Sequence, residues 1–156
     1  MSAKRLPDDI FRCIVENTPL VSVDLILMRE GRVLLGRRRN PPAKGYWFTL
    51  GGRVFKNERI RDAIDRIMLD ETGGGFAGEP TFVGVFEHLY DDGIYDGVST
   101  HYLNLAYRIG VETLSGLPRD QHDDYRWFRV EELLESAEVH PYVKDYFTKE
   151  KGTIPQ

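Results

Sequence analysis

The sequence contains a single cysteine, Cys13, among its 156 residues. An internal disulfide is therefore impossible, and a reducing cytoplasm is the expected compartment. Because Cys13 stands among Ile10, Ile14 and Val15, we expect it to be a small residue of the core rather than a nucleophile. The N-terminus also lacks the apolar core of a secretory signal.

Long apolar runs and basic stripes are absent as well. The longest apolar run, residues 21–28, is interrupted by Ser22 and Asp24 and is too short to span a bilayer, so no membrane is expected as a partner. The formal net charge is −4 and no stripe of lysine or arginine is present, so no nucleic acid is expected either. An acidic chain that binds a polyphosphate must concentrate arginines or a metal ion locally.

The pattern of apolar residues and breakers predicts one α/β domain covering residues 1–156, with strands broken by one central and one late helix. Strands are predicted over 20–28, 33–36, 46–50, 82–90, 100–109 and 125–130, the fifth antiparallel to the fourth. Helices are predicted over 7–16, 131–137 and 142–151, together with a central helix that ends before Gly73.

The central helix carries a misplaced carboxylate. Glu71 falls on the apolar stripe of this helix, which consists of Ile60, Ala63, Ile64, Ile67 and Met68. A carboxylate at this point is desolvated, and it also faces the negative end of the helix dipole. Either the helix frays before Glu71 and the side chain reaches water, or a bound cation offsets both penalties.

The spacing of the segment around this helix is specific. Five residues separate Gly52 from Glu58, seven separate Glu58 from Arg66, and Asp70-Glu71-Thr72-Gly73 follow. This pattern resembles the signature of the Nudix hydrolases. In that family this strand–loop–helix holds a divalent metal against a nucleoside diphosphate linked to another group. The resemblance implies a Nudix-type α/β/α sandwich with a mixed sheet.

Two positions depart from the family pattern. Ile67 stands where the family usually has a glutamate, and Asp70 replaces the first of the paired glutamates. The usual cluster of carboxylates is thereby thinned, because positions 67, 70 and 71 share one sector of the helix. Metal binding should then depend on Glu71 together with ligands from elsewhere.

Further segments resemble one branch of the family, the GDP-mannose mannosyl hydrolases. They are Tyr46-Trp47-Phe48, Glu87-His88, Thr100-His101-Tyr102 and the run from Gln121 to Trp127. In that branch water attacks the anomeric carbon of the sugar with inversion and releases GDP. The resemblance implies GDP-mannose as substrate with GDP-glucose as a second one, Mg²⁺ or Mn²⁺ as cofactor, and a homodimer.

The resemblance also implies roles for individual residues. Glu71, Gln121 and the backbone carbonyl of Gly51 would hold Mg²⁺, and His122 would be the general base. Six further residues would contact the substrate. Three arginines would stabilise the GDP leaving group and three other side chains would contact the sugar or its linkage: Arg38, Arg53 and Arg66, and Asp24, His88 and Tyr102.

Taken from the residues alone, several of these roles stay open. His122 lies in a polar loop and is either a surface histidine or, with an intrinsic pKa of ~6.5, a base suited to neutral pH. Arg66 lies four residues from both Asp62 and Asp70 and could form only ion pairs on the helix surface. Asp24 either faces solvent or has a functional role.

Two other functions compete with hydrolysis at carbon. The first is an ordinary Nudix pyrophosphohydrolase that cleaves a phosphorus–oxygen bond in another nucleoside-diphosphate compound. The second is a binding or regulatory module that kept the fold and lost catalysis; the presence of Glu71, Gly51, Gln121 and His122 argues against it.

Overall fold

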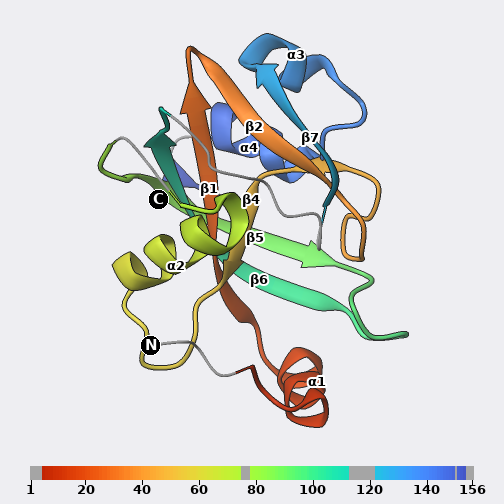
Figure 1. Cartoon of the computed structure of the whole chain (residues 1–156). Helices are drawn as coiled ribbons and strands as arrows, with labels where there is room; N and C mark the ends of the chain where they lie inside the picture. Colours follow the sequence, from red (N-terminus) through yellow and green to blue (C-terminus); the bar gives the residue numbers. More distant parts are fainter. Residues whose placement is uncertain (1–4, 75–77, 113–121, 150, 154–156) are drawn as a thin grey trace.

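The computed structural model describes residues 5–74, 78–112, 122–149 and 151–153 (Figure 1). Its elements in chain order are α1 (Asp8–Asn17), β1 (Leu20–Arg29), β2 (Arg32–Arg38), β3 (Trp47–Phe48), β4 (Leu50–Arg53), α2 (Ile60–Thr72), β5 (Thr81–Tyr90), β6 (Thr100–Gly110), β7 (His122–Arg129), α3 (Val130–Glu135), α4 (Pro141–Thr148) and β8 (Lys151–Gly152). The strand predicted over 46–50 is in fact two short strands that are separated at Thr49.

The strands form one mixed sheet in which β1 is central (Figure 1). Strand β1 pairs in parallel with β6, from Leu20 opposite Tyr102 to Met28 opposite Gly110. Its other edge is shared by two antiparallel neighbours, β4 along its first half and β2 at its far end. Strands β5 and β6 are antiparallel, as the sequence predicts. Strands β4 and β2 thus pair with different parts of the same edge of β1.

Two apolar clusters lie on opposite faces of this sheet, because successive side chains of a strand point to opposite faces. On one face Leu25 and Leu34 pack with Ile64 of α2. On the other face Ile26 and Leu35 belong to the cluster that includes residues of α3 and α4. Helices therefore cover both faces, and the α/β/α sandwich is confirmed.

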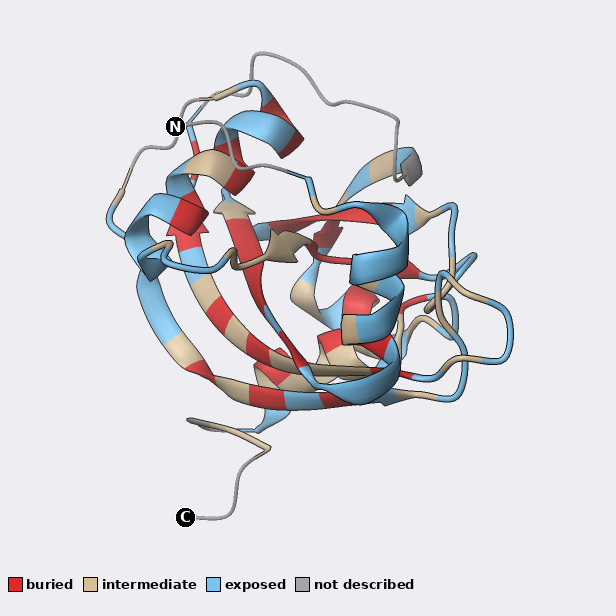
Figure 2. Cartoon of the chain, turned by 90° about the horizontal axis from the view of Figure 1, so that it is seen from below, coloured by how far each residue is buried: buried red, intermediate tan, exposed pale blue. Residues whose placement is uncertain are grey.

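Buried and exposed residues alternate along the longer strands (Figure 2), and β5, the strand beyond β6, is an example. In β5, Phe86 and His88 are buried while Glu87 and Leu89 are exposed. This period of two is typical of a strand with one face in the core. The buried side of β5 faces α4, where Phe86 contacts Tyr146 and His88 stacks on Tyr142.

Helix α1 differs from its prediction. Cys13 is exposed and Ile10 is 48% exposed, so the expectation that Cys13 fills the core is wrong. Val15 is the one buried residue of α1. The helix is attached mainly through its ends and its ring contacts, including a 2.9 Å hydrogen bond from the Tyr95 hydroxyl to the Asp8 carboxylate.

The structure excludes one of the two alternatives for the central helix, fraying before Glu71. Helix α2 continues through Thr72, and Glu71 is only 8% exposed, so the helix does not fray before it. Gly73 ends the helix in the left-handed conformation (φ 76°), and its N–H donates to the Leu69 carbonyl. None of the helices in the described part of the chain combines the length and apolar character that crossing a bilayer requires.

Candidate active site

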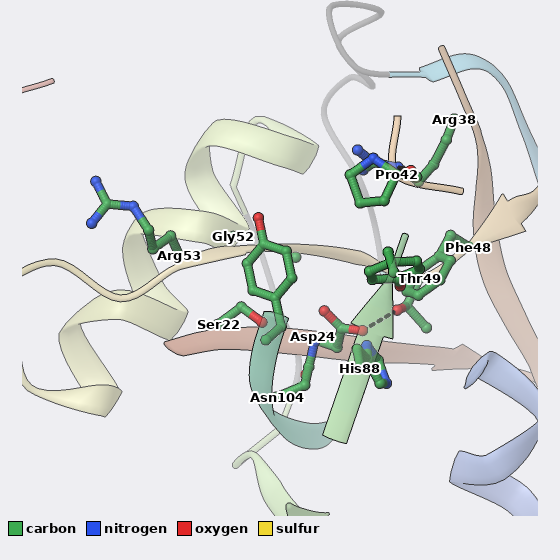
Figure 3. Close-up of a pocket in the computed structure, with 13 residues that line it drawn as sticks. Ser22, Asp24, Arg38, Pro42, Phe48, Thr49, Gly52, Arg53, His88 and Asn104 are labelled. Carbon is green, nitrogen blue, oxygen red and sulfur yellow. Dashed lines mark hydrogen bonds between the residues drawn. The ribbon is translucent and has the colours of Figure 1, made fainter. Parts of the chain in front are cut away.

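A cavity of about 240 Å³ opens between the sheet and the loop that precedes β3. Figure 3 shows the side chains around it. It is lined by Ser22, Asp24, Arg38, Pro42, Phe48, Thr49, Gly51, Gly52, Arg53, His88, Tyr90, Tyr102 and Asn104. Of the ten residues to which the sequence assigned a role, six line this cavity: Asp24, Arg38, Gly51, Arg53, His88 and Tyr102.

Strand register explains why these residues meet. Asp24 of β1 is opposite Gly51 of β4, and His88 of β5 is opposite Tyr102 of β6. Ser22 of β1 is opposite Asn104 of β6. Because residues two apart share a face, polar side chains from three strands form one polar floor.

Asp24 is buried at the centre of this floor, 6% exposed. The hydroxyls of Thr49 and Tyr146 both donate to its Oδ2, the first over 2.9 Å. Burial raises the pKa of Asp24, while hydrogen bonds from Tyr146, Asn104 and Thr49 and the charge of Arg38 oppose that rise. The carboxyl group is thus held in one orientation by neighbours on α4, β6 and the β3–β4 junction.

His88 is the second buried titratable group, 2% exposed. Its ring stacks on Tyr142, with 4.3 Å between the ring centroids and planes 1° apart. Burial lowers the pKa of His88 to about 4, and the charge of Asp145 opposes this only weakly. At neutral pH His88 is therefore a neutral imidazole that can share hydrogen bonds with hydroxyls but cannot attract phosphate by charge.

Arg38 and Arg53 bring positive charge to the edge of the cavity, and in Figure 3 the Arg53 guanidinium points away from Asp24. Arg38 is half-buried and its Nε donates to the Pro42 carbonyl over 2.9 Å, whereas its neighbour Arg37 is exposed. The guanidinium of Arg53 lies between two rings, 5.0 Å from the centre of Phe11 and 4.9 Å from that of Phe55. Arg37 and Arg38 are adjacent on β2, so their side chains point to opposite faces, and Arg38 is the one on the side of the cavity.

The same two arginines also border a larger cavity of about 800 Å³. Its walls come from α1, from the loop after β4 and from the loop between β5 and β6, and they include the rings of Phe11, Phe55 and Tyr95. The two cavities share Arg38, Pro42, Arg53 and Tyr102. A ligand with two ends can therefore occupy both cavities, with the arginines beside its middle.

Arg66 is placed differently. Its Nε donates to Glu58 Oε2 over 2.7 Å, and its Nη2 donates to Glu58 Oε1 over 3.0 Å and to the Arg53 carbonyl over 2.8 Å. Asp70 is a weaker partner, with 3.9 Å between the charged atoms. Arg66 does not line the cavity among the described residues. Arg66 thus links α2 to the end of β4 and to the loop after it, and Glu58 is its partner in the ion pair.

The residues expected to hold Mg²⁺ fit that ion in their chemistry. The Glu71 carboxylate, the Gly51 carbonyl and the Gln121 amide carbonyl each offer oxygen, the ligand atom that Mg²⁺ prefers. Strand β4 lies between the cavity and α2: a Cβ on Gly51 would come within 2.6 Å of Asp24 Oδ1, and one on Gly52 within 3.0 Å of Ile67. Within the described ranges no three His, Cys, Asp or Glu side chains gather to hold a metal. The expected Mg²⁺ ligand set therefore has one carboxylate, that of Glu71, and two neutral carbonyl oxygens.

Two of the expected residues cannot be placed by their side chains. Gln121 lies outside the described residues, and of His122 only the backbone is described. That backbone lies at the start of β7, where His122 is the register partner of Arg38. His122 therefore joins the sheet beside an arginine that lines both cavities.

Sequence reasoning missed Ser22, Thr49, Asn104 and Tyr146. Period-two alternation along β6 was a usable signal, because it places Asn104 on the same face as Tyr102. Tyr146 had no local signal, since its contact with Asp24 depends on how α4 packs. Trp47 is 6% exposed and packs against Phe128, so its ring belongs to the core.

Comparison with known proteins identifies the family. The model of the NUDIX domain matches residues 18–149. The low-salt glycan biosynthesis protein Agl8 of Haloferax volcanii is 43% identical over 143 residues, which is 91% of this chain and 88% of the relative. The uncharacterised Nudix hydrolase YvcI of Bacillus subtilis is 24% identical over 131 residues, which is 83% of this chain and 79% of the relative.

Solved structures share the fold. A MutT protein from Methanosarcina mazei Go1 superposes with a TM-score of 0.69 at 23% identity, covering 85% of this chain and 94% of that one. A MutT Nudix hydrolase from Burkholderia pseudomallei gives a TM-score of 0.65 at 24% identity, covering 85% of this chain and 98% of that one. With a family model spanning most of its length and the same sheet and helices, the chain belongs to the Nudix hydrolase family.

Proposed function

We propose that this Nudix hydrolase cleaves GDP-mannose, and GDP-glucose as a second substrate, into GDP and the free sugar. Water attacks the anomeric carbon and inverts it. The observation that carries the proposal is the polar cavity floor around Asp24, bordered by Arg38 and Arg53, two residues that also line a larger cavity. A sugar suits the floor, a diphosphate suits the arginines, and a nucleoside suits the wide cavity.

The chemistry of the reaction agrees with this placement of sugar, diphosphate and nucleoside. Displacement at an anomeric carbon needs a base that deprotonates water on the face opposite the leaving group, and His122 has that role. Arg38 and Arg53 lie beside the diphosphate and neutralise the charge that develops on GDP as the bond breaks. With a leaving group stabilised in this way, no strong general acid is required. Asp24, His88 and Tyr102 orient the sugar.

Mg²⁺, with Mn²⁺ as a substitute, would be held by Glu71, Gln121 and the Gly51 carbonyl, and it supplies further positive charge against the diphosphate. Arg66 acts indirectly, through Arg53. Its hydrogen bond to the Arg53 carbonyl fixes the end of β4 from which the Arg53 side chain extends. We further propose a homodimer. The relative Agl8 is named a low-salt glycan biosynthesis protein, and a nucleotide-sugar substrate is consistent with that name.

Hydrolysis in ¹⁸O-labelled water tests the proposal against the second candidate, an ordinary pyrophosphohydrolase. Attack at carbon puts the label in the free sugar, and attack at phosphorus puts it in a phosphate product. The label in phosphate would overturn the proposal. A purified protein that binds GDP-mannose but releases no GDP with Mg²⁺ would instead establish a binding or regulatory module.

A further inference from the structure

Several polar atoms on the cavity floor have no partner within the described part of the chain. They are Ser22 Oγ, Asn104 Oδ1 and His88 Nε2. The residues are 5%, 3% and 2% exposed, so water reaches them poorly. All three residues line the smaller cavity. Buried polar groups are nearly always hydrogen-bonded, and a group of such atoms around one cavity indicates a polar ligand.

Two of these residues have no role assigned so far, Ser22 and Asn104. They are direct register partners across the parallel pair β1–β6. Figure 3 shows both side chains beside Asp24 on the floor of the cavity. Neither a serine nor an asparagine is needed to stabilise a sheet interior, where apolar residues pack without a desolvation penalty. Their presence is therefore better explained by ligand binding than by folding.

The orientation of Asn104 defines what it can bind. Its side-chain amide donates a hydrogen bond to Asp24, so its Oδ1 is left as the acceptor. Asp24 in turn accepts from Thr49 and Tyr146 through Oδ2. The floor is thus rich in acceptors. Phosphate oxygens are also acceptors and would be repelled here, whereas sugar hydroxyls are donors and fit.

We propose that Ser22 and Asn104 determine sugar specificity, with Asn104 Oδ1 accepting a hydrogen bond from one hydroxyl of the hexose and Ser22 Oγ bonding a neighbouring hydroxyl. This inference rests on the proposed function, because it assigns the sugar of the GDP-sugar to the smaller cavity. Asp24 and Asn104 together then form a pair of acceptors that distinguishes sugars by the direction of their hydroxyls.

The test compares kcat/KM for GDP-mannose and its monodeoxy analogues in the wild type, Ser22→Ala and the isosteric Asn104→Leu. Each variant should lose about 2- to 13-fold with GDP-mannose through the contact to the sugar, the effect of one neutral hydrogen bond. With the analogue that lacks the contacted hydroxyl, Ser22→Ala should lose almost nothing. Asn104→Leu also removes a donor to Asp24, so it should lose a common factor with every analogue and the further loss only where the contacted hydroxyl is present. Ser22→Ala removes only one oxygen, so it keeps the test valid even if Asn104→Leu does not fold.

Tyr146→Phe is the matched control, because it removes a donor to Asp24 from outside the cavity. It should lower kcat/KM for all analogues by a similar factor. If Ser22→Ala and Asn104→Leu also act equally on every analogue, they act through the fold or through Asp24, and the inference is overturned while the hydrolase activity stands.

A wild type that releases no GDP from any of these compounds would overturn the proposed function instead. Calorimetric titration then tests the inference separately, with GDP-mannose and GDP as the two probes. We expect GDP-mannose to bind more tightly than GDP, and we expect the difference to shrink in Ser22→Ala and Asn104→Leu. Equal affinities for the two probes in the wild type would overturn the inference.

Discussion

The hydroxyl of Tyr146 on α4 donates to the carboxylate of Asp24 on β1, a contact between residues 122 positions apart in the sequence. Both residues are buried. The contact joins the helix layer on one face of the sheet to the centre of the cavity floor. Asp24 cannot change orientation without losing this bond and the one from Thr49.

Replacing Tyr146 by Phe should lower the free energy of unfolding by about 1–3 kcal/mol, because the buried Asp24 then lacks one of its donors. Urea unfolding of the wild type, Tyr146→Phe, Asp24→Leu and the double variant measures this as a cycle. The loss caused by Tyr146→Phe should be much smaller in the Asp24→Leu background. Strictly additive losses would show that the two side chains are not coupled.

Gly51→Ala should destabilise the protein by about 1–3 kcal/mol and reduce GDP release, because the new methyl group would lie 2.5 Å from the Val23 carbonyl and 2.6 Å from Asp24 Oδ1. Gly52→Ala is the matched control. Its methyl group would lie 3.0 Å from Ile67 Cγ1, a side chain that can shift, so its effect should be smaller. Thermal melts and GDP release measure both; an equal effect of the two changes would contradict the contact at Asp24.

Arg66→Lys should lower the free energy of unfolding by about 1–3 kcal/mol, because lysine cannot reproduce the paired hydrogen bonds to Glu58 together with the one to the Arg53 carbonyl. Arg61→Lys on the same helix is the control, since the Arg61 side chain is 48% exposed and its ion pairs contribute little. A loss of kcat in Arg66→Lys without any loss of stability would instead favour direct contact with the leaving group.

Acid should destabilise the protein through His88. Its pKa is about 4 in the folded state and ~6.5 in the unfolded state, so between these values the unfolded chain binds the extra proton. The stabilisation is complete above pH ~6.5 and is lost as the pH falls, by about 3 kcal/mol at pH 4. Urea unfolding at several pH values should show this slope in the wild type and a shallower one in His88→Phe. Identical slopes would mean that His88 is not buried in its neutral form.

His122→Gln should lower kcat by roughly 10²–10⁴ with a modest effect on substrate binding, as expected when a general base is removed. Arg129→Gln, at the exposed far end of the same strand, is the control and should keep full activity. Steady-state GDP release from GDP-mannose with Mg²⁺ measures both. Full activity of His122→Gln would remove this residue as the base.

Glu71→Gln should weaken the Mg²⁺ dependence and turnover together, because Glu71 is the one carboxylate among the expected ligands. Titrating Mg²⁺ against GDP release measures the effect. Asp70→Asn is the control, because Asp70 is exposed on the same helix turn. An unchanged metal titration in Glu71→Gln would remove Glu71 as a ligand.

The parts of the fold that depend on local periodicity could be predicted from the sequence. The stripe of α2 and the burial of Glu71 follow from the helical period, and the position of Arg38 opposite to Arg37 follows from the strand period. The exposure of Cys13 could not be predicted, because the apolar residues around it do not reveal how little of α1 the sheet covers.

The partner of Arg66 shows the same limit. Helical spacing pointed to Asp62 and Asp70. The structure keeps Asp70 as a weak partner at 3.9 Å, and the main partner is Glu58, which lies before the helix and is brought near by the loop after β4. Side chains that meet because of loop shape or helix docking leave no periodic signal. The cavity depends on several such contacts. More of its lining residues were therefore named through the family resemblance than through periodicity.

The parallel pairing of β1 with β6 has a consequence for how the protein is made. Ser22 and Asn104 lie on strands that emerge from the ribosome far apart in time, with α2 and β5 synthesised between them. A nascent chain that ends at β5 lacks β6, the parallel neighbour of β1, and therefore lacks the part of the smaller cavity that β6 lines. Acquiring the native sheet and acquiring the ability to hold a ligand are therefore one late event in biosynthesis.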